Sequence, residues 1–179
     1  MVALHFLAKK HKVTAVHYMH SDSVTAAAEL EFVKTAASNA GIPLLVCKQT
    51  TQRNPKMSRE AYWRQGRYAW FKEFDQPVVT GHHLDDAVEW YLMTALRGRG
   101  EYMAYSNGNV VRPFLCQKKS AILDYAAKYN VKYLHDASND DVEFAVRNRV
   151  RHSILPEALK VNPGLYNVVR KRIFNKEHG

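Results

Sequence analysis

The chain has 179 residues, and its 26 Lys and Arg residues outnumber its 17 Asp and Glu residues, for a formal net charge of +9. With 46% apolar residues, this length favours one domain with a sizeable core and excludes collagen-like and low-complexity classes. No apolar run reaches the roughly 20 residues of a membrane span, so we expect no membrane partner. Two cysteines that form no disulfide framework favour a reducing, cytoplasmic location. The basic excess favours a polyanionic partner such as nucleic acid.

The cysteine and histidine spacing argues against a disulfide framework or a metal site. Cys47 and Cys116 lie far apart and form no C-x-x-C motif. His17 and His20 are three residues apart in an expected strand, so their side chains point to opposite faces and do not form a natural metal pair.

The first half of the chain alternates helix and strand with short connections. The predicted elements are a helix at 1–12, a strand at 13–20, a helix from Ser23 to Gly41, a strand at 44–47, a loop at 49–57, a helix from Ser58 and a strand at 77–80. Parallel strands joined by right-handed crossovers follow from this order. The expected fold is therefore α/β, with a doubly wound, mostly parallel, Rossmann-like sheet.

The second half is mainly helical. The pattern Asp86-x-x-Glu89 has the form of a capping box, and an apolar stripe follows it as far as Gly98. The remaining predictions are an extended segment at 110–115, a helix ending at Asn130, a turn-rich segment at 136–141, a helix at 146–155 interrupted by Pro156, and a last basic helix after Asn162-Pro163. We place the α/β domain at residues 1–115 and its helical extension at 116–179.

A phosphate-binding loop is absent from these residues. A doubly wound sheet ordinarily begins with a strand and a Gly-rich turn that holds phosphate, whereas this chain opens on the helix. Neither G-x-G-x-x-G nor G-x-x-x-x-G-K-[ST] occurs in it. The sheet therefore lacks its expected first strand.

The segment from Gly81 to Glu89 is the main candidate site, because ligands of open α/β sheets bind where a strand hands over to a helix. Asp85 and Asp86 are candidates for holding Mg²⁺ or orienting an amine, and His82 for stabilising negative charge. The alternative is that the acidic residues only cap the helix and complement its dipole. Capping does not explain two adjacent histidines.

Basic residues recur in three further places, at helical spacing in two of them. Arg64 and Arg67 share a helix face that suits phosphate or a carboxylate, or is simply solvated. Arg147 and Arg151 share another, with Asn148 beside it, and a guanidinium row of this kind suits an RNA backbone or a solvated surface. Arg97-Gly98-Arg99-Gly100 is either a basic RNA-binding loop or a helix C-cap.

The order and spacing of these motifs resemble the tRNA(Ile)-lysidine synthetases of the PP-loop ATP pyrophosphatase superfamily. The motifs are Ala15-Val16-His17 with His20, Glu60-Ala61-x-x-Arg64-x-x-Arg67-Tyr68, His82-His83-x-Asp85-Asp86-x-x-Glu89, Leu96-Arg97-Gly98-x-Gly100, Arg112-Pro113-Phe114-Leu115, Asp136-x-Ser138-Asn139-x-Asp141, Phe144-x-x-Arg147-Asn148-x-Val150-Arg151, Leu155-Pro156 and Asn162-Pro163. Related tRNA 2-thiolation enzymes share the His-His-x-Asp-Asp motif but also rely on cysteines that this chain does not match.

The resemblance implies a ligase that acts on the wobble cytidine of an isoleucine tRNA. ATP, with Mg²⁺, would adenylate the C2 oxygen of the base with loss of pyrophosphate, and the amine of free lysine would then displace AMP. The implied catalytic residues are Asp86, Asp85, His82, Glu89 and Arg64. The implied ATP-binding residues are His17, His20, Arg67 and His83. The implied tRNA-binding residues are Arg97, Arg99, Arg147, Asn148 and Arg151, of which Arg147 and Arg151 would face the tRNA or brace the site.

The family also carries a Ser-Gly-Gly-x-Asp-Ser segment that binds the ATP phosphates, and these 179 residues do not contain it. Three explanations compete: a start codon assigned too far downstream, a split gene whose second polypeptide brings the loop, and a decayed protein that binds tRNA without catalysis. We expect the reading frame upstream of Met1 to encode a strand followed by this motif.

Overall fold

The computed structural model describes residues 1–20, 25–134 and 146–178. These residues form two compact units, which consist essentially of Ala3–Val78 and Val79–Gly179. Within the described ranges, no helix combines the length and the apolar character needed to cross a bilayer. The expected division of one domain into 1–115 and a helical extension at 116–179 stays a prediction.

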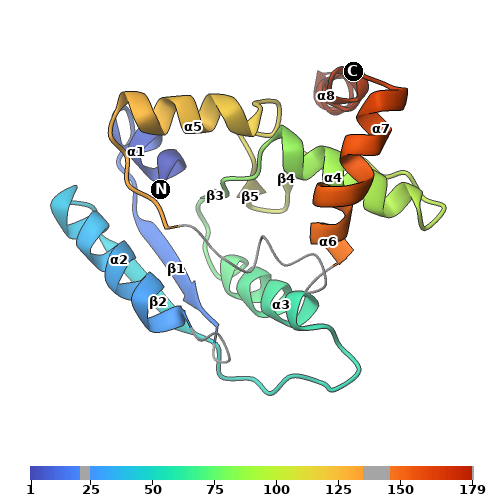
Figure 1. Cartoon of the computed structure of the whole chain (residues 1–179). Coiled ribbons are helices and arrows are strands. Elements are labelled where there is room, and N and C mark those ends of the chain that lie inside the picture. The colour runs from blue at the N-terminus through green and yellow to red at the C-terminus, as the bar shows by residue number, and fades with distance from the viewer. Residues whose placement is uncertain (21–24, 135–145, 179) are drawn as a thin grey trace. The chain divides into compact units, whose positions relative to one another are not determined.

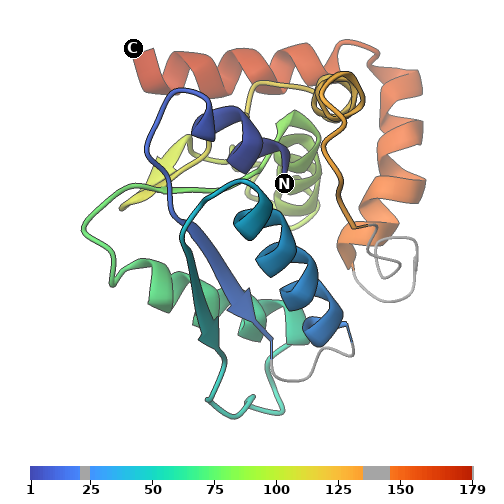
Figure 2. The same cartoon turned by 90° about the vertical axis from the view of Figure 1, so that its left-hand side faces the viewer.

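Two parallel strands form the centre of the first unit. Strands β1 (Ala15–Met19) and β2 (Leu44–Lys48) pair with Ala15 opposite Leu44 and Met19 opposite Lys48, after helix α1 (Val2–Ala8). Helix α2 (Ala26–Asn39) connects the two strands, and α3 (Arg59–Phe71) follows them. Figures 1 and 2 show α2 on one face of the strand pair and α3 on the other. The predicted α/β fold with parallel strands and helices on both faces is confirmed.

Local capping explains where these helices begin and end. The backbone at Gly41 has φ +62°, which glycine adopts without strain, and α2 ends just before it. Ser58 caps α3 as predicted, because its hydroxyl accepts a hydrogen bond from the Ala61 backbone N–H. Helix α2 has Thr25 at its N-cap, and the predicted cap Ser23 lies outside the described residues.

Gly66 lies within α3, where alanine is ordinarily more stable than glycine by about 1 kcal/mol. A Cβ at this position would collide with the Tyr18 hydroxyl and would lie 2.9 Å from Nε2 of the buried Gln49. We therefore expect Gly66→Ala to lower the free energy of unfolding by about 1–3 kcal/mol in urea denaturation. Gln65→Ala, at the exposed neighbouring position, should change it by less than about 0.5 kcal/mol. A more stable Gly66→Ala variant would contradict this close packing.

The second unit contains a small sheet and most of the helices. Strands β3 (Val78–Val79), β5 (Val110–Val111) and β4 (Ser106–Asn107) lie in this order, and β4 and β5 form an antiparallel hairpin that turns at Gly108. The extended segment predicted at 110–115 is shorter than expected. Its remainder folds into hydrogen-bonded turns, in which Arg112 O accepts from Leu115 N and Phe114 O accepts from Gln117 N.

The core of the second unit forms between α4 (Leu84–Ala95), α7 (Leu155–Val161) and α8 (Leu165–His178). Its buried apolar residues are Leu84, Ala87, Val88, Leu115, Leu155, Leu165, Val169 and Ile173. The predicted apolar stripe therefore does face a core, although Leu96 at its end is 65% exposed. Helix α5 (Lys119–Lys128) ends two residues before Asn130, the predicted end, and Asn130 has the left-handed φ of +50°.

Pro156 does not interrupt the helix as predicted. Helix α6 (Val146–Arg149) continues through a π-helical turn, Val150–Ile154, into α7. The Leu155 N–H donates to the Val150 carbonyl five residues back, so the helix widens by one residue just before the proline. Pro156 then occupies the first turn of α7. The predicted turn-rich segment at 136–141 lies outside the described residues.

Candidate active site

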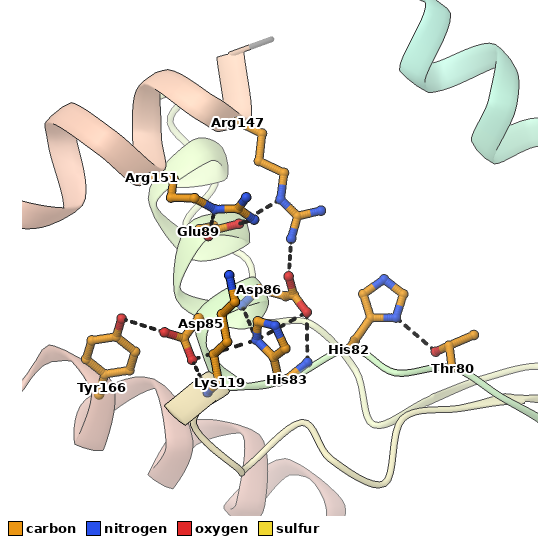
Figure 3. A network of polar contacts seen from close by, with 10 residues as sticks. All are labelled: Thr80, His82, His83, Asp85, Asp86, Glu89, Lys119, Arg147, Arg151 and Tyr166. Carbon is orange, nitrogen blue, oxygen red and sulfur yellow. Dashed lines mark hydrogen bonds and ion pairs between the residues drawn. The ribbon is translucent and has the colours of Figure 1, made fainter. Parts of the chain in front are cut away.

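The candidate site of the second unit is built around the first turn of α4 (Figure 3). His83 is the N-cap residue, with its Nδ1 3.4 Å from the Asp86 backbone N–H, and Asp86 Oδ2 accepts from the His83 backbone N–H at 2.8 Å. This is a capping box, but it begins three residues earlier than the predicted one. Asp86 is its third helical residue rather than its cap, and Glu89 is thereby free for another role.

Asp85 connects three elements of the unit. Its Oδ1 accepts a hydrogen bond of 3.0 Å from the Tyr166 hydroxyl on α8, and its Oδ2 accepts one of 2.7 Å from the Lys119 backbone N–H at the start of α5. His83 Nδ1 lies 3.7 Å from the same Oδ2. Asp85 therefore fixes the first turn of α4 against α5 and α8.

Glu89 binds two guanidinium groups. Its Oε2 accepts from Arg147 Nε at 2.7 Å, and its Oε1 accepts from Arg151 Nε, also at 2.7 Å. A second nitrogen of Arg151 lies 3.2 Å from Oε2. The Glu89 side chain is only 2% exposed, so these bonds supply the pairing that a buried carboxylate requires.

Asp86 joins the two parts of this network. Its Oδ2 holds the helix cap, while its Oδ1 pairs with Arg147 Nη2. Arg147 thus bridges two carboxylates one helical turn apart (Figure 3). Each of the two Asp86 oxygens accepts one bond from these groups, and a carboxylate has about four acceptor positions, so Asp86 keeps capacity for a further donor.

His82 lies apart from the carboxylates in Figure 3, with its Nδ1 2.9 Å from Thr80 Oγ1. The strand-end segment after β3 positions it, and Thr80 N donates to Val111 O at 3.0 Å on the neighbouring strand. This contact orients the imidazole ring, so that its Nε2 is directed away from Thr80.

The acidic cluster does not fit a bound Mg²⁺ ion. Mg²⁺ requires oxygen ligands in near-octahedral geometry. It usually keeps several of its water ligands and binds one or two carboxylates. Here Arg147 and Arg151 already neutralise Asp86 and Glu89, and the two oxygens of Asp85 accept from the Tyr166 hydroxyl and the Lys119 backbone N–H. Within the residues that the structure describes, no group of three or more His, Cys, Asp or Glu side chains is arranged to hold a metal. The expectation that Asp85 and Asp86 hold Mg²⁺ is not supported by these contacts.

The structure favours the bracing role for Arg147 and Arg151. Arg147 and Arg151 neutralise the acidic cluster, and Asn148 is buried with 5% of its surface exposed. Arg97 and Arg99 are exposed, and Arg99 Nε lies 3.5 Å from Glu101. RNA contact by these five residues stays a prediction. Ser138, Asn139 and Asp141 lie outside the described residues.

The remaining predicted site residues belong to the first unit. The His20 ring stacks on Trp63 at 4.7 Å, and the exposed Arg64 guanidinium lies 4.5 Å from the centre of the Tyr68 ring. Burial lowers the pKa of His17, although the charge of Glu29 acts in the opposite direction. His17 Nε2 is buried and has no hydrogen-bond partner among the described residues. Arg67 lies on α3 with Arg64.

Tyr166 is a site residue that the sequence analysis did not identify. It follows Asn162-Pro163, which drew attention only as a helix start, and it lies 81 residues from Asp85. Burial and the neighbouring Asp85 carboxylate raise the pKa of its phenol well above the ordinary value, so the hydroxyl stays a donor at neutral pH. The Lys118 ammonium lies 4.8 Å from the centre of its ring.

Tyr166→Phe removes the donor to Asp85 and keeps the ring. We expect it to lower the free energy of unfolding by about 1–2 kcal/mol, because a hydrogen bond to a charged group is lost while Asp85 keeps its Lys119 contact. Urea denaturation measures this change. Tyr133→Phe, at a position 55% exposed, is the matched control and should change stability by less than about 0.5 kcal/mol. Equal stability of the two variants would contradict the role given to the hydroxyl.

Comparison with solved structures defines the fold. The chain superposes on a U34-tRNA thiolase, NcsA from Methanococcus maripaludis with its [4Fe-4S] cluster, with a TM-score of 0.71 and 14% sequence identity. The superposition covers 97% of this chain and 66% of the thiolase. At this identity the likeness concerns the fold alone. Cys47 and Cys116 are both free thiols here, and desolvation raises the pKa of each above its ordinary value.

The family model of the PP-loop domain matches residues 1–158, and the chain therefore belongs to the PP-loop family. Within that family, its relatives include the tRNA(Ile)-lysidine synthases of Lactiplantibacillus plantarum, at 31% identity over 92% of this chain, and of Pseudomonas fluorescens, at 33% over 87%. A third, from Francisella tularensis subsp. novicida, is 34% identical over 66%. The chain spans only 41%, 38% and 36% of these three relatives, respectively.

Proposed function

We propose that this chain is the catalytic domain of a tRNA(Ile)-lysidine synthase, which uses ATP to join free lysine to the wobble cytidine of an isoleucine tRNA. The observation that carries the proposal is the cluster of Asp85, Asp86 and Glu89, ordered by Arg147 and Arg151 at the start of α4. The kinship with lysidine synthases supports the same reaction. A cytoplasmic location, where tRNA and free lysine are both present, is part of the proposal.

The chemistry suits such a site. The C2 oxygen of cytidine is a poor leaving group until adenylation makes it part of AMP, after which an amine can displace it at C2. A domain for this reaction mainly has to position the reactants and neutralise developing charge. We assign Asp86 to the lysine amine, because each of its oxygens accepts only one of these bonds, whereas Glu89 accepts three from two guanidinium groups. His82 is assigned to negative charge on the phosphate or the base.

ATP binding is assigned to His17, His20 and Arg67 of the first unit and to His83 of the second, and Arg64 is assigned to ATP or the reacting groups. The buried, unpaired Nε2 of His17 fits a polar ligand at that strand. The proposal requires a Ser-Gly-Gly-x-Asp-Ser segment from the preceding reading frame or from a second polypeptide. Mg²⁺ would accompany ATP, and its ligands are not assigned to the acidic cluster.

ATP-dependent incorporation of radiolabelled lysine into an isoleucine tRNA transcript with a wobble cytidine tests the function. The chain is assayed alone and after fusion to the upstream segment. We expect at least one of the two forms to give product. No product should form without ATP or with ornithine in place of lysine. tRNA binding without product from both forms would instead identify a noncatalytic RNA-binding domain and contradict the proposal.

A further inference from the structure

Helix α8 carries an exposed face that combines basic, amide and aromatic side chains. Asn167, Arg170, Lys171 and Phe174 recur at the i, i+3, i+4 and i+7 spacing that places residues on one side of a helix. All four are exposed, Phe174 to 55%. Leu165, Val169 and Ile173 on the opposite side are buried in the core shared with α4. We call Asn167, Arg170, Lys171 and Phe174 the α8 face.

The cations of the α8 face differ from those of the acidic cluster. Within the described residues, neither Arg170 nor Lys171 is within ion-pair distance of a carboxylate, whereas Arg147 and Arg151 are both neutralised internally. A guanidinium nitrogen of Arg170 instead donates to Asn167 Oδ1 at 2.7 Å. This bond orients the guanidinium along the helix and leaves most of its five N–H donors available. Of these two groups of basic residues, the one on α8 is therefore the more available to a polyanion.

We propose that the α8 face is an RNA-binding surface, in which Arg170 and Lys171 contact phosphates and Phe174 stacks on an unpaired base. The planar guanidinium group matches phosphate oxygens in a bidentate manner, and the neighbouring ammonium adds a second contact. An exposed aromatic ring one turn further along the helix is the element that single-stranded RNA uses for stacking. The inference rests on the proposed function, because it takes the tRNA as the RNA.

Binding of the full chain to the isoleucine tRNA transcript, followed by fluorescence anisotropy over about 50 to 200 mM salt, tests this surface. We expect R170E/K171E to weaken binding at least about tenfold and to reduce the slope of log K against log salt by about one for each phosphate that the variant no longer neutralises. Phe174→Ala should weaken binding about tenfold with an unchanged slope, because stacking releases no counterions.

The matched control is K34E/K160E, which makes the same change in net charge at two exposed lysines that already pair with glutamates at 2.7 Å. It should bind tRNA within about threefold of the unchanged chain. If R170E/K171E binds tRNA as tightly as this control, the α8 proposal is overturned and the lysidine synthase function still stands. The same holds if both variants lose tRNA affinity equally, because the change in net charge alone would then explain the loss. A chain that binds no tRNA in any form would overturn both. Circular dichroism of each variant confirms the helical content.

Discussion

Glu89→Gln will lower the free energy of unfolding of this protein by about 3 kcal/mol. The Glu89 side chain is 2% exposed and holds Arg147 and Arg151, which are 29% and 23% exposed, through bonds of 2.7 Å. Removing one partner of a buried ion pair leaves an uncompensated charge, which costs about 3–5 kcal/mol, and the partial exposure of the arginines places the loss at the lower end. Urea denaturation followed by circular dichroism measures it.

The chain contains a control for this prediction. Glu157 and Lys160 form an ion pair of the same length, 2.7 Å, but their side chains are 69% and 71% exposed. Solvent already screens that pair, so Glu157→Gln should change stability by less than about 0.5 kcal/mol. Glu89→Gln with a similarly small effect would mean that the arginines are held by other contacts and that Glu89 does not organise the cluster.

Local sequence patterns predicted the parts of the fold that depend on neighbouring residues. The Ser58 cap, the apolar stripe of α4 and the left-handed residue Gly41 are readable because each acts within one or two helical turns. The order of helices and strands then determined the α/β class, since parallel strands require crossovers.

Sequence-based predictions were wrong in two situations. In one, two local capping patterns competed for the same helix start. In the other, the role of a side chain depended on a residue far away in the sequence. Asp86 and Glu89 match a capping box, but His83 begins the helix instead, because its imidazole Nδ1 can cap as an oxygen does. Arg147 and Arg151 have the helical spacing of a solvated basic face. Glu89 lies 58 and 62 residues away from them, and no periodicity shows that it withdraws both from the surface.

Some residues of the candidate site could be predicted from local sequence, and others could not. The motif from His82 to Glu89 was identifiable from residue type and its place at the end of a strand. Tyr166 was not, because one tyrosine after a helix start resembles any partly buried aromatic residue. Its pairing with Asp85 depends on α8 packing against α4, which is a property of the folded core.

Asp86→Asn should abolish lysidine formation in a chain supplied with the Ser-Gly-Gly-x-Asp-Ser segment, with a loss of at least about a hundredfold in turnover. The asparagine oxygen can still cap α4 through the His83 N–H, so the helix start is preserved. What is lost is the negative charge that we assign to the lysine amine. Ligation of labelled lysine to the tRNA transcript measures turnover, and tRNA binding measured beside it should stay within about threefold, because Asp86 is not a phosphate contact.

Asp124→Asn, at an exposed position on α5, removes the same charge without touching the cluster and should retain full turnover. Asp86→Asn also loses an ion pair with Arg147, so both variants are compared by urea denaturation, and the assay is run where each is fully folded. Because the folded fraction is then equal, a difference in product formation reports on the carboxylate itself. Turnover by Asp86→Asn equal to that of Asp124→Asn would show that Asp86 only caps a helix, and the reaction would have to be assigned to other groups.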